Sequence, residues 1–233
     1  MTREARIFRA LTTDLWVTER AQRFLAAEMG TRMTVIRLAD GGLFIHSPVA
    51  LGNATRAELA TLGPVRHVVA PNRYHHLYVA PYLSAYPEAQ VYAAPGLPEK
   101  RRDLRFHEVL SDDAPAAWAG QIDQLVFRPL PILNEVVFFH RPSRTLIVCD
   151  LVTNVERSSS PLTRLFFWLD DSYGKLGAGR LWRLLIRDRP AARGAIDHIL
   201  SWDFDRIIMA HGNVLETGGC DAFRAGFAWL FRS

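Results

Sequence analysis

The chain lacks the features that mark disulfide-rich, secreted and membrane-spanning proteins. Its 233 residues include only two cysteines, Cys149 and Cys220, so we do not expect a disulfide framework. No apolar run approaches the roughly 20 residues that a membrane-spanning helix needs, and the most apolar stretch covers only residues 165–169. Residues 1–6 are mostly polar, and no apolar segment of a signal peptide follows them. We therefore expect a cytoplasmic protein with no membrane partner.

The chain also lacks the short motifs of several catalytic and binding classes. It contains no Gly-rich phosphate loop, no Gly-x-Ser-x-Gly motif and no Cys-x-x-Cys pair. The net charge is +4, but the basic residues are spread along the chain and do not alternate with aromatic residues. We therefore expect no nucleic-acid partner, and we interpret the basic cluster Lys100–Arg102 as a solvated loop.

Apolar residues, in contrast, make up 49% of the chain, which is enough for a full core. Apolar and β-branched runs predict two hairpins, one over Thr34–His46 around an Asp-Gly turn and one over Glu135–Cys149. A helix is predicted over residues 53–63 and a buried strand over Val65–Ala70, while the last third is mostly helical. This succession predicts one α/β domain with mixed sheets, spanning residues 1–233.

Three of the predicted strands end in side chains that commonly bind metals. The first strand delivers His75 and His76 just beyond its end, the second is followed by Asp150, and the third by His211. Because open sheets bind ligands beyond the ends of their strands, we expect these residues to lie close together.

Each candidate also has a purely structural interpretation. Adjacent residues on a helix point about 100° apart, so His75 and His76 fit one ligand and one packing residue as well as two ligands. A carboxylate such as Asp150 costs free energy at the edge of a core unless it is paired, hydrogen-bonded or metal-bound. Its structural interpretation is a cap of the segment that follows. The glycine after His211 allows a ligand to approach closely. His140, at a hairpin turn, is predicted to be a surface histidine.

The order of these elements resembles the metallo-β-lactamase superfamily, in which metals bind along one edge of two packed sheets. Most of the chain takes part in the resemblance, which implies a four-layer αββα sandwich of two mixed β-sheets. In it, Asp150 matches the metal-bridging Asp after the second hairpin, and His211 matches the final His. More closely, the Pro-Asn-x-x-His-His signature resembles a branch of that superfamily described as a domain of unknown function.

The histidine motif departs from the His-x-His-x-Asp-His pattern of the superfamily. If His75 and His76 occupy the Asp-His half, Pro71 and Arg73 stand where the first two histidines belong. In a second alignment, Asn72 takes the place of the first histidine, Tyr74 that of the second and Leu77 that of the last. The histidine expected just before the Glu135 strand is absent in both alignments.

Under the first alignment, the resemblance implies a reduced site for a single Zn or Fe ion. The implied ligands are His75, His76, Asp150 and His211. Asp150 and His75 would be catalytic, while Asn72 and Glu135 would support the ligands or accept a proton. The implied function is a metal-dependent hydrolase of a small-molecule substrate.

The missing histidines favour an alternative, a metal-free and catalytically inactive relative that binds a ligand or a partner. The apolar residues 165–169, with Trp182 and Trp202, are predicted mainly as core. Their other interpretation is an apolar pocket or a homodimer interface. An iron-dependent oxidoreductase is a third function, which the sequence does not separate from hydrolysis.

Overall fold

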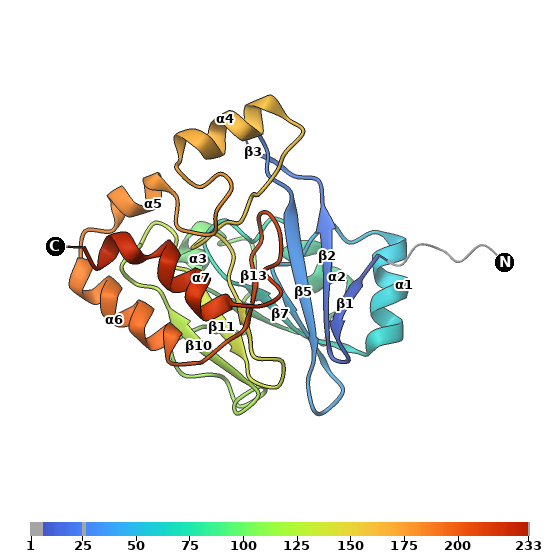
Figure 1. Cartoon of the computed structure of the whole chain (residues 1–233). Coiled ribbons are helices and arrows are strands. Elements are labelled where there is room, and N and C mark those ends of the chain that lie inside the picture. Colours follow the sequence, from blue (N-terminus) through green and yellow to red (C-terminus); the bar gives the residue numbers. More distant parts are fainter. Residues whose placement is uncertain (1–6, 25–26, 233) are drawn as a thin grey trace.

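Two sheets organise the protein in the computed structural model, which describes residues 7–24 and 27–232 (Figure 1). The larger sheet has the order β1-β2-β5-β6-β7-β8-β9 and the smaller one β10-β11-β12-β13. The strands of the larger sheet are β1 (Arg9–Thr12), β2 (Leu15–Arg20), β5 (Thr31–Arg37), β6 (Leu43–His46), β7 (Val65–Ala70), β8 (Gln90–Ala93) and β9 (Glu108–Val109). Those of the smaller sheet are β10 (Ile122–Val126), β11 (Val136–His140), β12 (Thr145–Ile147) and β13 (Arg206–Ile208). The short strands β3 (Arg23–Phe24) and β4 (Ala27–Glu28) pair separately.

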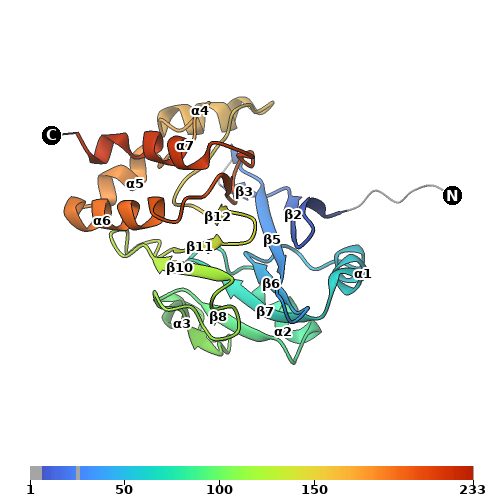
Figure 2. The same cartoon turned by 60° about the horizontal axis from the view of Figure 1, so that its bottom comes forward.

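Helices cover the outer faces of both sheets, as the rotated view shows (Figure 2). The helices are α1 (Asn53–Leu62), α2 (Val79–Ala85), α3 (Leu97–Lys100), α4 (Pro161–Leu169), α5 (Arg180–Leu185), α6 (Arg189–Leu200) and α7 (Gly219–Gly226), with a 3-10 turn at Ala228–Leu230. None of the helices in the described ranges has both the length and the apolar character that a membrane crossing requires.

Both sheets are mixed, as the sequence predicts. In the larger sheet β1, β2, β5 and β6 are antiparallel neighbours, and β6 to β9 are parallel. In the smaller sheet β10, β11 and β12 are antiparallel, and β12 is parallel to β13. The two predicted hairpins are the β5–β6 and β11–β12 pairs, and the predicted strand at Val65–Ala70 is β7.

Alternation along the strands divides the core into layers. Ile36 of β5 and Phe138 of β11 pack together between the two sheets. The neighbouring Val35 faces the other way, against α1 and α2, while Val137 faces α6 and α7. Side chains on a strand alternate between faces, so each strand feeds two layers. This confirms the predicted αββα sandwich.

Two predictions about side-chain exposure are wrong. His140 is buried, because β11 is an inner strand covered on both faces, and its Nδ1 lies 2.7 Å from the Ser143 hydroxyl. The apolar run at 165–169 is not mainly core: Phe167 is buried, whereas Leu165, Trp168 and Leu169 are each more than half exposed. Hydrophobicity alone does not tell which side of a short helix meets the protein.

Candidate metal centre

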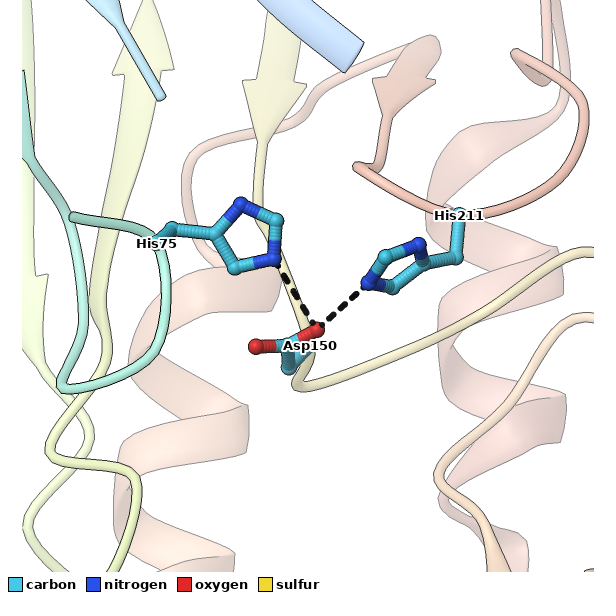
Figure 3. Close-up of side chains that lie close together, drawn as sticks. All are labelled: His75, Asp150 and His211. Carbon is cyan, nitrogen blue, oxygen red and sulfur yellow. Dashed lines mark ion pairs between the residues drawn. The ribbon is translucent and has the colours of Figure 1, made fainter. Parts of the chain in front are cut away.

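Three side chains from separate loops converge at the edge where β7, β12 and β13 end (Figure 3). The Nε2 atom of His75 lies 3.3 Å from Oδ1 of Asp150, and Nε2 of His211 lies 3.0 Å from the same oxygen. One ligand atom from each residue lies within 4.8 Å of the other two. In the described ranges this is the one group of three or more His, Cys, Asp or Glu residues compact enough to share a cation.

His75 is placed by a turn that Asn72 builds after β7. The Asn72 side-chain oxygen accepts hydrogen bonds of 2.8 Å from the backbone N–H groups of both Tyr74 and His75. Such a bond turns the chain sharply and aims the His75 ring at Asp150. The far ring nitrogen, Nδ1, lies 2.7 Å from the hydroxyl of Ser47 at the end of β6. The ring is therefore held at both ends.

His211 is oriented by a backbone carbonyl from a distant part of the chain. Its Nδ1 donates to the carbonyl oxygen of Gly30 over 2.8 Å. A carbonyl oxygen only accepts, so Nδ1 carries the hydrogen and the lone pair of the neutral ring is at Nε2, facing Asp150. The buried Arg32 steadies the loop by donating to the carbonyl oxygens of Met209 and Gly212 on either side of His211.

Asp150 rests on a buried network built by Glu135 and Asn72. Both oxygens of Glu135 accept backbone N–H bonds at the end of β12, among them those of Cys149 at 2.8 Å and Asp150 at 2.7 Å. The Asn72 side-chain amide donates to Glu135 at 3.0 Å and to Oδ2 of Asp150 at 2.8 Å. Asn72 therefore satisfies one oxygen of Asp150 and leaves Oδ1 to the two histidines.

The charges in this network are interdependent. Burial alone would raise the pKa of Asp150, but His75 and His211 outweigh burial and hold that pKa well below its usual range. Burial likewise opposes protonation of His75, but the Asp150 carboxylate raises the His75 pKa above its ordinary value. Burial and the nearby Asp150 raise the pKa of Glu135 to about 7, against the N–H donors that favour its charged form.

His76, expected as a fourth ligand, lies outside the group. Its Nδ1 is 2.8 Å from a guanidinium nitrogen of Arg101. Burial and the charges of Lys100 and Arg101 lower its pKa to about 4. The turn made by Asn72 aims the two neighbouring rings in different directions, so only His75 faces Asp150. This geometry corresponds to the interpretation of the pair as one site histidine and one packing histidine.

The structure also gives roles to residues that the sequence did not single out. Ser47 follows the end of β6, and a polar residue directly after a buried strand is the same signal that marked Asp150. The contribution of Gly30 is a backbone oxygen, which no residue pattern reveals. Glu135 and Asn72 lie beside the ligand loop, where both Glu135 oxygens accept backbone N–H bonds and Asn72 donates to Asp150.

Nε2 of His75, Oδ1 of Asp150 and Nε2 of His211 therefore face one point. The carboxylate oxygen of Asp150 and the lone pair of neutral His211 repel each other at 3.0 Å unless a proton or a cation lies between them. The three side chains are 10–13% exposed, so ions and water can reach them. Two imidazole nitrogens and one carboxylate oxygen form a donor set that suits zinc or ferrous iron.

Comparison with solved structures identifies the fold. The metallo-β-lactamase from Pontibacter korlensis is similar with a TM-score of 0.64 and 11% identity, over 97% of this chain and 99% of that one. FIM-1 from Pseudomonas aeruginosa, a metallo-β-lactamase in its mono-zinc form, has a TM-score of 0.63 and 12% identity, over 96% and 92%. The metal-soaked Flv1 flavodiiron core from Synechocystis sp. PCC6803 has a TM-score of 0.65 and 12% identity, over 96% and 60%.

At the level of sequence, no curated protein matches the chain. A family model described as Domain of unknown function (DUF4336) matches residues 12–169, which include β7, Asn72, His75 and Asp150. The solved structures agree on two packed mixed sheets with outer helices. The chain therefore belongs to the family Domain of unknown function (DUF4336), and it has a metallo-β-lactamase-like fold.

Proposed function

We propose that the protein is a hydrolase that uses one divalent cation, zinc or iron, held by His75, Asp150 and His211. The bond from His211 Nδ1 to the Gly30 carbonyl carries the proposal, because it turns a lone pair toward the Asp150 carboxylate. Two imidazole nitrogens and a carboxylate oxygen turned toward one point suit a cation. The proposed substrate is a small molecule, as expected for a site at the edge of a sheet.

The donor set supports this proposal on chemical grounds. Catalytic zinc sites commonly have three protein ligands and an open position, and the three residues here match that number. When bound, such a cation supplies Lewis-acid activation of water or of a substrate oxygen. FIM-1, which has a similar fold, is described in a mono-zinc form, and this is in line with a single ion here.

The residues of the chain have separate parts in the proposed reaction. Asp150 stays ionised at neutral pH, which suits its Oδ1 to bind the cation. His75 holds the other side of the site, with its Nδ1 fixed by the Ser47 hydroxyl. Asn72 and Glu135 act through Asp150 as positioning residues, because their polar atoms bond to the ligand loop.

Metal content tests the first half of the proposal. We expect the purified protein, after incubation with Zn²⁺ or Fe²⁺ and desalting, to retain close to one ion per chain by elemental analysis. His75→Ala and Asp150→Ala should lose it. His76→Ala is a matched control, since it removes a neighbouring histidine that bonds to Arg101 instead, and it should retain the ion. A wild-type protein that binds no metal after reconstitution would support the metal-free alternative.

Activity tests the second half. The metal-loaded protein should hydrolyse at least one member of a panel of chromogenic carboxylic esters, lactones and phosphodiesters, and Asp150→Asn should abolish that activity. Two histidines and a carboxylate are also the ligands of ferrous oxygenases, so oxygen consumption by the iron-loaded protein is measured alongside. Retained metal with no hydrolysis of the panel counts against a hydrolase while leaving the metal site standing.

A further inference from the structure

Helices α4 and α5 carry an uncovered apolar surface, called here the α4–α5 patch. It consists of Leu162, Leu165, Trp168, Leu169, Leu181 and Leu184, each more than half exposed. The helices are joined end to end, because Asp170 at the end of α4 accepts a 3.1 Å hydrogen bond from the backbone of Leu181 in α5. In Figure 1, α4 stands out from the body of the protein, with α5 beside it. Large apolar side chains exposed together on two adjoining helices mark an interaction surface.

The inner face of α4 is anchored, so its outer face is presented in a fixed direction. Phe167 is buried, and the Thr163 hydroxyl accepts a 2.8 Å hydrogen bond from the backbone N–H of Glu28 in β4. Ser160 caps the start of the helix through the N–H of Thr163. The exposed leucines are therefore the ordered outer side of an anchored helix.

The patch is surrounded by positive charge that the protein itself does not neutralise. Residues 157–187 contain six basic and two acidic side chains, a net charge of +4, and the acidic Glu156 and Asp188 flank this range. One acidic residue, Asp171, already pairs with Lys175 and Arg183. The other, Asp170, accepts bonds from Ser172 and Leu181. In the part of the chain that the structure describes, four exposed arginines here pair with no carboxylate: Arg157, Arg164, Arg180 and Arg187.

We infer that the α4–α5 patch docks on the surface of an anionic lipid bilayer. Leucines and an exposed tryptophan on anchored helices suit shallow insertion at a membrane interface, and flanking arginines suit anionic headgroups. The expectation of no membrane partner rested on the lack of a spanning segment, and an interfacial helix needs none. Docking of this kind does not depend on the proposed metal or hydrolysis.

A second copy of the chain and a nucleic acid each suit only one part of the patch. In a symmetric dimer the same surface meets itself, so the excess of arginines on one copy would face the same excess on the other. A nucleic acid would satisfy the arginines but would leave Leu165, Leu169 and Leu184 without an apolar partner. An anionic bilayer satisfies both the apolar and the charged parts of the patch.

Sedimentation with vesicles tests the inference. We expect the full chain to co-sediment with phosphatidylcholine vesicles that contain roughly one-third phosphatidylglycerol, much more than with pure phosphatidylcholine, and less as salt rises. The double variant Leu165→Glu/Trp168→Glu should bind at least about tenfold more weakly, since it removes apolar contact and adds negative charge. Arg164→Gln/Arg180→Gln should weaken binding to the anionic vesicles alone.

Two control variants match these changes elsewhere on the surface. Val109→Glu adds a charge at an exposed apolar position on the edge strand β9, and Arg141→Gln removes an arginine that pairs with Asp123 at the β11–β12 turn. Both should bind as the wild type does. Equal binding by Leu165→Glu/Trp168→Glu overturns the inference. So does equal binding to neutral vesicles, or a dimer in light scattering that the same double variant converts to monomer.

Discussion

Asp150 and His211 each lie three residues beyond a pair of partners, Ile147 and Ile208, in the parallel strands β12 and β13. Because these strands run side by side in register, residues the same number of positions beyond the pair emerge at one edge of the sheet. The result is a 3.0 Å approach between Oδ1 of Asp150 and Nε2 of His211. Strand register thus supplies two of the three side chains of the candidate centre, and the turn at Asn72 adds the third, His75.

Zinc binding should release protons and strengthen with pH. In the metal-free protein Asp150 raises the pKa of His75 against the effect of burial, so part of His75 is protonated near pH 7 and must lose that proton to bind metal. The same pair stabilises the metal-free fold below pH 6.5, and this contribution is lost as the pH rises through the raised pKa.

Calorimetry of zinc binding in two buffers with different ionisation enthalpies measures the released protons. The observed heat should differ between the buffers and the difference should shrink from pH 6.5 to pH 8. His76→Ala, whose ring faces Arg101, should show the same dependence as the wild type. Heats that do not depend on the buffer would contradict the prediction.

Asn72→Asp should destabilise the fold strongly at neutral pH although it barely changes the shape of the side chain. The new carboxyl group replaces an amide that donates to both Glu135 and Asp150, and so brings a third carboxyl group into a buried cluster. We expect a loss of about 3–5 kcal/mol in the free energy of unfolding at pH 8. Burial raises the pKa of the new group, so the loss should decrease as pH falls toward 5.

Urea denaturation of the wild type and Asn72→Asp at pH 5, 6.5 and 8 measures this difference. A surface substitution of the same kind, such as Asn53→Asp at the exposed first residue of α1, serves as the control and should change stability little. A penalty for Asn72→Asp that is equal at all three pH values would argue against the carboxylate cluster as its cause.

Gly212→Ala should be far more damaging than Gly120→Ala, although both glycines have a positive φ, of 90° and 82°. An added Cβ at Gly212 would overlap the backbone carbonyl of Asn154, whereas one at Gly120 meets nothing within 4 Å. The shared left-handed backbone costs about 1–2 kcal/mol in each variant. We expect Gly212→Ala to lose at least about 2 kcal/mol more stability than Gly120→Ala, as measured by thermal unfolding. This additional loss would come from the clash beside His211. Equal losses of stability in the two variants would show that the loop at Gly212 shifts to accommodate the added Cβ.

His140→Asn should flatten the dependence of stability on pH. Burial lowers the pKa of His140 to about 4, although the charge of Asp14 acts in the opposite direction. As pH falls, His140 therefore binds a proton near pH 6.5 in the unfolded chain but not in the folded one. Stability from this group therefore falls as pH drops from 6.5 to 4, by about 1.4 kcal/mol per pH unit at most. Between pH 7 and pH 5, the free energy of unfolding from denaturation curves should fall by about 2 kcal/mol less in His140→Asn than in the wild type. An unchanged difference would indicate that His140 is hydrated.

Local sequence was sufficient for most of the secondary structure. The β5–β6 hairpin, α1 and β7 match their predicted ranges closely, because apolar runs and Asp-Gly, Gly and Pro punctuation are local signals. The ends of β7, β12 and β13 also marked His75, Asp150 and His211, since a polar residue directly after a buried strand needs a reason to be there. The two mixed sheets followed from the order of these elements.

Tertiary structure alone decided which residues do what. It separated His75 from His76, because the direction of each ring depends on a turn closed by Asn72 and on Arg101. It supplied the Gly30 carbonyl, which belongs to no side-chain pattern and reaches His211 only through folding. It also turned α4 so that its leucines face outward. The strands and the chemical types at their ends depend on neighbours along the chain, so they could be predicted from the sequence. Ring orientation and surface exposure depend on neighbours in space.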